Sequence, residues 1–225
     1  MGKMASGVFN FGEFGWNQLL TVVGLIVTMV IAIGGFRTFG RWKREKIEER
    51  RIDVALEALS VAYEALDVFA DIRNPGAFGY EYADMPRAEG ESDEEWRRKT
   101  TFYVPLKRMD NQKEFFIKVL KLRPRLMAVF GPEVEKVFAE LNQARAYVQV
   151  AAQILMRPDF AQNMTEQNIK LRNRLEADMW SGMAAVYSEE ELPGGDRVQK
   201  NVDAFRDGIV RLCRPIVDRE FKVKA

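Results

Sequence analysis

Residues 19–36 read LLTVVGLIVTMVIAIGGF, and no charged residue interrupts them. As a helix that starts at Trp16, this stretch is long enough to cross about 30 Å of hydrocarbon, the thickness of a bilayer core. Trp16 and Trp42 flank the stretch, and amphipathic rings prefer the headgroup level of a membrane. The sequence therefore predicts one transmembrane helix over residues 17–36.

The charges around the apolar stretch predict its orientation. A cleaved signal peptide carries positive charge before a shorter apolar run, but here only Lys3 precedes the run, and Glu13 offsets it. The basic residues follow the run instead: Arg37, Arg41, Lys43, Arg44, Lys46, Arg50 and Arg51. Because positive charge stays in the cytoplasm, we expect a cell-membrane protein with residues 1–16 outside and the C-terminal domain in the cytoplasm. The same basic flank argues against a buried helix of a soluble domain.

The membrane segment has two groups of candidate site residues. The membrane interface is predicted at Trp16, Trp42, Arg37, Arg41, Lys43 and Arg44. A row of small residues on one helix face, which would allow another transmembrane helix to approach closely, consists of Thr21, Gly24, Thr28, Ala32 and Gly35. This row indicates either self-association or the ordinary composition of a membrane helix. The basic helix 37–51 also contains glutamates; we interpret it chiefly as fixing topology, although contact with anionic lipid headgroups is compatible with it.

Composition excludes several classes of function. The chain has 225 residues, with 34 Lys and Arg against 33 Asp and Glu, no histidine and one cysteine, Cys213. A balanced charge argues against a dedicated nucleic-acid-binding protein. The lack of histidine excludes Ser-His-Asp catalysis and His-ligated zinc. With no nucleotide-binding or catalytic motif, we expect no enzyme activity, no cofactor and no metal, and we expect Cys213 to be a buried apolar residue.

The remaining chain has the period of helices. Two apolar rows with alternating steps of three and four residues run from Ile52 to Phe69 and from Val54 to Ile72. An acidic strip separates them, formed by Asp53, Glu57, Ser60, Glu64, Asp67 and Asp71. A helix that is apolar over most of its circumference is buried on two sides. Because no strand pattern is present, we predict an all-α fold: one N-terminal transmembrane helix followed by a cytoplasmic helical bundle of about five helices, over residues 52–225.

The later helices are predicted from caps and breakers. Ser92 with Glu95 forms a capping box, Thr165 or Asn163 caps a helix that extends to Tyr187, and Asp196 caps the last helix. Pro105 predicts a break between two helices, and Pro124 an end or a kink. We expect the basic residues between positions 107 and 125 to lie on a solvated face, opposite the acidic strip.

A long loop is the candidate partner-binding site of the predicted bundle. Residues 75–92 read PGAFGYEYADMPRAEGES, and Phe78, Tyr80 and Tyr82 are spaced through its first half. Long loops in compact domains are often functional or disordered. The interpretation that follows is a membrane-anchored interaction or scaffold protein, in contact with the lipid bilayer and with a protein partner or a second copy of itself. The alternative is a membrane effector, toxin-like or defensive, whose assembled transmembrane helices perturb the bilayer.

Overall fold

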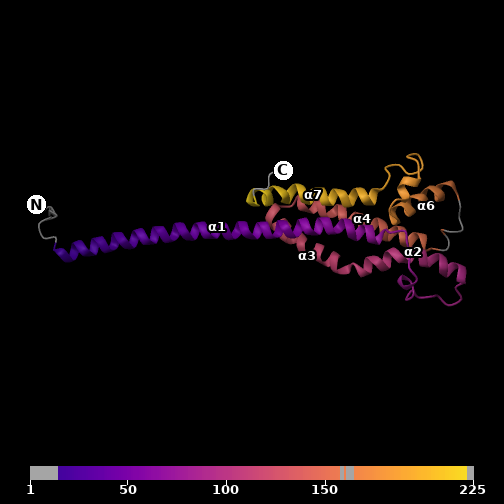
Figure 1. Cartoon of the computed structure of the whole chain (residues 1–225), viewed down its shortest axis with the longest axis horizontal. Coiled ribbons are helices and arrows are strands. Elements are labelled where there is room, and N and C mark those ends of the chain that lie inside the picture. Colours follow the sequence, from indigo (N-terminus) through magenta and orange to yellow (C-terminus); the bar gives the residue numbers. More distant parts are fainter. Residues whose placement is uncertain (1–14, 158–159, 161–164, 222–225) are drawn as a thin grey trace, which may run out of the picture. The chain divides into compact units, whose positions relative to one another are not determined.

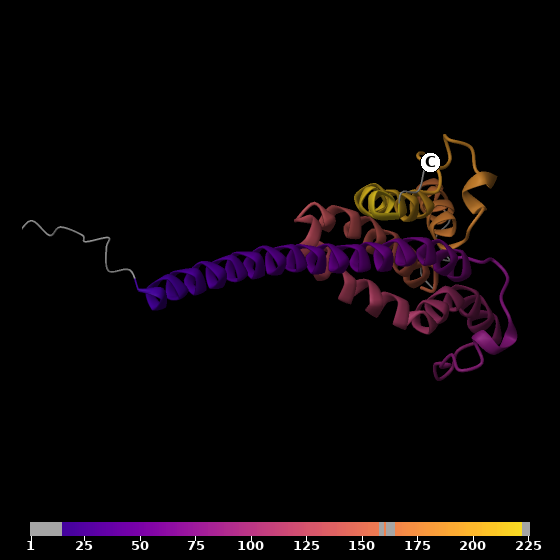
Figure 2. The same cartoon turned by 60° about the vertical axis from the view of Figure 1, so that its left-hand side comes forward.

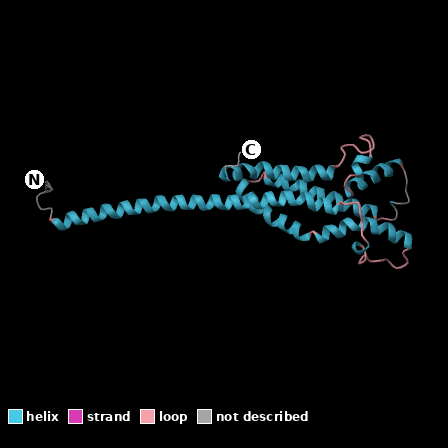
Figure 3. Cartoon of the chain, viewed as in Figure 1, coloured by secondary structure: helices cyan, strands magenta, loops and turns pink. Residues whose placement is uncertain are grey.

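The computed structural model describes residues 15–157, 160 and 165–221. In the residues that the structure describes there are six α-helices and no strand (Figure 3). The predicted all-α fold is therefore confirmed. Most of the segment predicted to be extracytoplasmic, residues 1–14, lies outside the described residues.

Helix α1 (Trp16–Ile72) is one continuous helix. It includes the apolar stretch, the basic segment after it and the first helix of the bundle. The apolar part has a mean hydropathy of 2.5 over its best 18-residue window, and none of that window is buried. By length and composition, α1 is therefore able to cross a membrane. Packing divides the chain into two units, Met1–Arg50 and Arg51–Ala225.

Five further α-helices lie in the described part of the second unit. They are α2 (Asp93–Asn111), α3 (Lys113–Phe130), α4 (Val134–Leu155), α6 (Glu166–Met179) and α7 (Arg197–Phe221). Two short 3-10 turns, η2 (Gly79–Glu81) and η3 (Met183–Val186), lie in the connections. Figures 1 and 2 show the bundle part of α1 running alongside α3, α4 and α7.

The second unit has a large core and a smaller one. In the large core, both predicted apolar rows of α1 are buried against α3, α4 and α7, and the fully buried alanines Ala55, Ala58, Ala62 and Ala65 allow close neighbours. Asp53, Ser60 and Asp67 remain exposed on the edge between the rows. The smaller core is formed by Ala151, Ala152, Leu155, Leu175, Met179 and Trp180. Both cores follow from the helical period of the apolar residues.

Pro105 does not separate two helices and Pro124 does not end one, contrary to those two predictions. Helix α2 continues through Pro105 and α3 continues through Pro124, while the actual break lies at Gln112. A proline frees the carbonyl four residues earlier, which belongs here to Thr101 and Leu120, and both residues are exposed. Water can satisfy those carbonyls, and the packing of the buried side on the core keeps each helix continuous.

Helix α6 ends earlier than predicted. Thr165 caps it by accepting a hydrogen bond from the Asn168 backbone N–H at 3.3 Å, as expected, whereas Asn163 lies outside the described residues. The helix stops at Met179 instead of continuing to Tyr187. Gly182 follows with a φ of +80°, a conformation that glycine adopts without steric cost. The change of direction places Trp180 in the smaller core.

Gly208 lies inside α7, where α7 crosses α4. A Cβ atom added at Gly208 would lie 2.8 Å and 2.9 Å from the two Cγ atoms of Val137. Those distances are well inside van der Waals contact, and the β-branched valine has little rotamer freedom. The glycine is therefore required by close packing of two helices.

We expect Gly208→Ala to lower the free energy of unfolding by about 1–2 kcal/mol, because overpacking a core outweighs the gain of about 1 kcal/mol in helix propensity. Thermal unfolding followed by circular dichroism measures the change. In a Val137→Ala background the added methyl group has room, so Gly208→Ala should there be neutral or stabilising. An equal loss in both backgrounds would contradict the packing explanation.

Candidate functional site

The apolar segment of α1 presents its small residues on an open surface. A Cβ atom added at Gly24 or Gly35 would meet nothing within 4 Å. The Thr28 hydroxyl donates to the carbonyl of Gly24 at 2.8 Å, so its polar group is satisfied within the helix. Thr21 and Ala32 lie on the same exposed segment. The segment thus combines an apolar surface with a face of small side chains.

The basic segment that follows has aromatic residues among its charges. Phe39 and Trp42 pack with ring centroids 5.8 Å apart, and both rings are exposed. Trp16, at the other end of the apolar stretch, is also exposed. Lys43 lies next to Trp42 in the exposed basic segment. Each predicted membrane-interface residue is therefore on the surface of α1, at one or the other end of its apolar stretch.

The acidic strip of α1 faces basic residues of α3. Lys118 Nζ lies 2.7 Å from Glu64 Oε2, and Arg125 lies 2.6 Å from Glu57. Both pairs are partly exposed, and such pairs typically contribute about 0.2–1 kcal/mol each. The predicted pairing of these two helices is confirmed for these residues. Glu57 and Glu64 of the acidic strip therefore form ion pairs within the bundle.

The aromatic residues of the loop 75–92 separate into two environments. Tyr82 packs edge-on against Trp96 of α2, with ring centroids 6.1 Å apart. Phe78 and Tyr80 instead stack on each other, with centroids 5.7 Å apart and planes inclined by 7°. Phe78 is 58% exposed and Tyr80 is 75% exposed. The loop thus attaches to the bundle through Tyr82 and presents a pair of stacked rings to solvent.

Arg108 of α2 holds this loop in place. Its guanidinium donates to Glu81 Oε1 at 2.6 Å and to Glu81 Oε2 at 3.0 Å, and both residues are buried. It also donates to the backbone carbonyls of Asp71 at 3.2 Å and Asn74 at 2.6 Å, and to that of Gly76. One side chain therefore joins α2, the end of α1 and the turn that carries Phe78.

The electrostatics of this contact favour an ionised Glu81. The hydrogen bond from Arg108 lowers the pKa of the Glu81 carboxyl below its usual value, against the opposing effect of burial. The backbone N–H of Phe78 also donates to Glu81, at 2.8 Å, and lowers the pKa further. Bidentate, charge-assisted hydrogen bonds of this kind are among the strongest in proteins.

Arg73 performs a similar role at the end of α1. It is the largest fully buried side chain, 1% exposed. Its guanidinium donates to the carbonyls of Ala177 at 2.7 Å, Asp178 at 3.1 Å and Trp180 at 3.3 Å, at the C-terminus of α6. It also contacts Asp196 Oδ2 at 2.9 Å. A positive charge at a helix C-terminus is favourable, so Arg73 stabilises this end of α6.

A second ion pair, between Arg197 and Asp178, lies next to Arg73 at the C-terminus of α6. Arg197 donates to Asp178 Oδ1 at 2.8 Å and Oδ2 at 2.5 Å, and Asp178 is buried. The Arg197 guanidinium lies 3.7 Å from the ring centroid of Tyr147 on α4. The hydrogen bond with Asp178 raises the pKa of Arg197 above its usual value. Arg73 and Arg197 thus connect the ends of α1, α6 and α7 with α4.

Comparisons with protein-family models, with curated proteins and with solved structures found no match. Among the described residues, no group of three or more His, Cys, Asp or Glu side chains is placed to hold a metal ion.

Sequence reasoning missed the buried charges. Arg108 was expected on a solvated face with its basic neighbours, and the structure corrects this because Glu81 and three carbonyls surround it. Arg73, Glu81 and Asp178 were not singled out. A signal does exist: Arg73 continues the apolar row of Phe69 by one helical step, and Arg108 follows Val104 in the same way. A charge in line with buried residues indicates a buried partner.

Cys213 lies in the core on α7, fully buried as expected. Burial raises the pKa of its thiol to about 12, so almost no thiolate is present at neutral pH. Since the thiolate is the nucleophile, we expect the folded protein to resist a maleimide reagent at pH 8 and to react fully in denaturant. Mass spectrometry of the labelled protein measures this. Rapid labelling of the native chain would contradict the buried position.

Proposed function

We propose that this chain is a membrane-anchored interaction protein, in which α1 crosses a bilayer and the bundle binds a protein partner or a second copy at the cytoplasmic face. No catalytic step is part of the proposal, and neither a cofactor nor nucleic acid is needed for it. The lipid bilayer is the first partner. The second is recognised by the bundle and the loop 75–92.

The observation that carries the proposal is the exposed apolar surface of α1. A window of 18 residues with a mean hydropathy of 2.5 is entirely unburied. Transfer of apolar surface from water stabilises by roughly 25 cal/mol per Å², so such a surface requires an apolar environment. No charged residue lies between positions 19 and 36, and that length matches the hydrocarbon of a bilayer.

The continuity of α1 favours an anchor over a cleaved signal sequence. The helix runs without a break from Trp16 to Ile72. Its last turns supply Ala65, Phe69 and Ile72 to the core of the bundle. Signal peptides end at a small-residue cleavage site soon after a short apolar run, whereas arginine and aromatic residues follow this one.

The loop supports the choice of an interaction surface. Phe78 and Tyr80 are exposed and stacked, while Arg108 restrains the turn that carries them. Aromatic residues are enriched at the centres of protein interfaces. A surface that is ordered before binding loses less conformational entropy when a partner docks.

Membrane fractionation tests the anchor. We expect the full chain to remain with membranes after extraction with alkaline carbonate, and a C-terminal tag to resist protease added to intact cells. Leu25→Arg with Met29→Arg should release the chain from the membrane fraction, because each charge at mid-membrane costs about 2.5–3.5 kcal/mol or more. Arg substitutions at the exposed Ile169 and Leu171 of α6 serve as the matched control. Recovery of the unmodified chain in the soluble fraction would refute the anchor.

Photo-crosslinking tests the interaction surface. A photoreactive phenylalanine analogue at Tyr80 is expected to give a discrete crosslinked product in cells. The same group at Val186, which is 71% exposed in η3, is the control for random encounters. Phe78→Ser should abolish the product at position 80. Equal products at both positions, or none at Tyr80, would remove this surface from the proposal.

A second candidate function follows from the small-residue face of α1. Gly24 and Gly35 leave space for another helix to approach closely, and assembled helices of this kind could perturb the bilayer. In this case overexpression would depolarise the membrane, and Gly24→Leu would prevent it. An unchanged membrane potential on overexpression eliminates this candidate.

A further inference from the structure

We propose that the surface hollow over Gly40, framed by Arg37, Arg41 and Arg44, binds the phosphate of an anionic phospholipid. The inference rests on the proposed membrane anchoring and names the lipid class that the anchor selects. The hollow is lined by these residues together with Phe36 and Thr38, and it lies wholly within the first unit of the chain.

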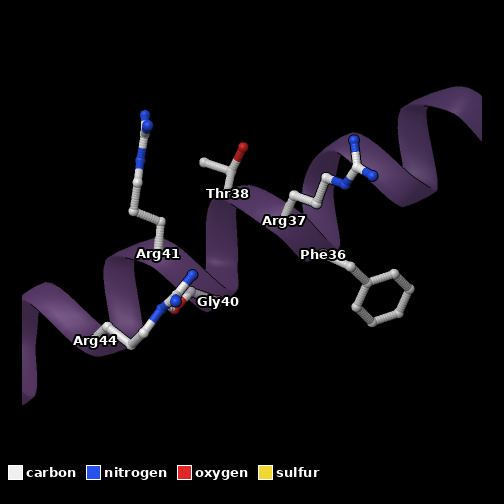
Figure 4. Close-up of a pocket in the computed structure, with 6 residues that line it drawn as sticks. All are labelled: Phe36, Arg37, Thr38, Gly40, Arg41 and Arg44. Carbon is white, nitrogen blue, oxygen red and sulfur yellow. Dashed lines mark hydrogen bonds between the residues drawn. The ribbon is translucent and has the colours of Figure 1, made fainter.

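The three arginines share one side of α1. They follow one another by four and three residues, the steps that bring side chains together on a helix surface. Figure 4 shows Arg37 and Arg41 extending from the same side of the ribbon, while the ring of Phe36 points away from them. Gly40 lies between the arginines and has no side chain to fill the space.

A hydrogen bond to the backbone of Gly40 holds the Arg44 side chain across the hollow. Its Nε donates to the carbonyl of Gly40 at 3.3 Å, and in Figure 4 its guanidinium lies next to Gly40. A Cβ atom added at Gly40 would meet nothing within 4 Å, so there is free volume beside the guanidinium. The terminal nitrogens of Arg44 have no other partner among the described residues, and they remain available for a ligand.

The neighbouring cations are also available. Arg37 has no hydrogen-bond or ion-pair partner in the part of the chain that the structure describes. Arg41 lies 3.8 Å from Glu45, and these side chains are 78% and 69% exposed. An exposed pair at that distance contributes little and can exchange for a stronger anion. The hollow is therefore lined by three guanidinium groups that make few or weak interactions with the described residues.

The chemistry of these groups selects a phosphate. Guanidinium groups bind phosphate oxygens in pairs of parallel hydrogen bonds, and three of them balance more than one negative charge. A zwitterionic phosphatidylcholine would bring its ammonium group close to the same arginines, which is unfavourable. An anionic headgroup such as phosphatidylglycerol has no such cation. The sequence supplies Phe36, Phe39 and Trp42 at the same level of the helix, and these aromatic residues suit the boundary between headgroups and acyl chains.

Native mass spectrometry of the full chain in detergent tests this assignment. The protein is mixed with equal amounts of phosphatidylglycerol and phosphatidylcholine that have identical acyl chains, and the retained lipids are counted. Because three guanidinium groups can donate to the phosphate at one defined position, we expect a preference of about tenfold or more for phosphatidylglycerol. The triple variant R37Q, R41Q and R44Q should lose that preference.

Two further variants separate a defined site from general positive charge. Gly40→Leu keeps every arginine and improves helix propensity, but its side chain occupies the hollow, so the preference should fall to below about twofold if a single bidentate contact is lost. The variant K113Q, K121Q and K136Q removes the same charge from exposed positions of the bundle and should retain the full preference. A wild-type preference in Gly40→Leu would overturn the proposal.

The lipid preference of the unmodified chain and its response to inorganic phosphate also test the proposal. Equal binding of the two lipids by the unmodified chain overturns the proposal, while recovery of that chain in carbonate-washed membranes leaves the anchor intact. Loss of the bound lipid on addition of millimolar inorganic phosphate would assign the hollow to a soluble anion instead of a lipid. Retention of phosphatidylglycerol in excess phosphate supports the lipid assignment.

Discussion

Arg73→Met is expected to lower the free energy of unfolding of the bundle by about 3–5 kcal/mol, the usual cost of removing one partner from a buried charge pair. Arg73 is 1% exposed and donates to three carbonyls at the end of α6 and to Asp196. Methionine fills much of the volume but donates no hydrogen bond. The carbonyls and the carboxylate would then lose a partner that water cannot easily replace.

The measurement is thermal unfolding of the full chain in mild detergent, followed by circular dichroism and by tryptophan fluorescence. For a domain of this size the expected loss corresponds to a fall in Tm of roughly 6–20 °C. Trp180 is 7% exposed and its carbonyl accepts a hydrogen bond from Arg73, so its emission should shift to longer wavelength. Arg211→Met makes the same chemical change at an exposed position of α7, and it should alter stability by no more than about 0.5 kcal/mol. Similar losses in the two variants would show that Arg73 acts only as general charge.

Arg108→Met should have an effect of similar size, about 3–5 kcal/mol, because it leaves Glu81 buried without its cation. It should also release the loop 75–92, since Arg108 donates to the carbonyls of Asn74 and Gly76. Limited proteolysis of the native variant is expected to cut within the loop. Lys113→Met, at an exposed position of α3, is the control and should leave the loop resistant. Wild-type resistance in Arg108→Met would mean that other contacts hold the loop.

The ion pair between Arg108 and Glu81 makes the stability of the bundle depend on pH. The folded pKa of Glu81 lies below its ordinary value of 4.5, so its contribution to stability is fully present above that value. The contribution is lost as the pH falls through the lowered pKa, because the folded state must then bind a proton that it disfavours. Glu81→Gln removes this dependence. The difference in Tm between the unmodified chain and Glu81→Gln should therefore be largest at neutral pH and shrink toward pH 3.

An exposed carboxylate supplies the control for this measurement. Glu94→Gln, in the first turn of α2, removes a charge at an exposed position. Its Tm should stay close to that of the unmodified chain at neutral pH. If the gap between Glu81→Gln and the unmodified chain did not change on acidification, the ion pair with Arg108 would not be the source of the stability.

The two arginines also bear on the proposed interaction. Arg108 restrains the turn that presents Phe78 and Tyr80. Arg73 secures the end of α1 from which that turn begins, and the Arg73 backbone carbonyl accepts a hydrogen bond from Ser181 at 2.8 Å. A partner that recognises the stacked rings would therefore lose affinity in Arg108→Met, even though neither ring is altered.

The sequence by itself determined the elements with strong local periodicity. The apolar run 19–36, the two apolar rows of the bundle part of α1 and the caps at Ser92 and Thr165 were each readable, because helical period and capping depend on residues within a few positions of one another. The pairing of α1 with α3 through Glu64 and Lys118 was also foreseen from their opposite charge. The position of the loop 75–92 followed from its breakers.

Only the tertiary structure decided where the charges are buried and where the helices stop. Arg73 and the Asp178 carbonyl that it binds are separated by 105 residues, and no local pattern joins them. Pro105 and Pro124 remain inside helices because their freed carbonyls belong to exposed residues, and exposure is a property of the packed bundle. The free energy of a buried charge or of a helix end depends on the groups that surround it in space, and for this protein those groups come from distant helices.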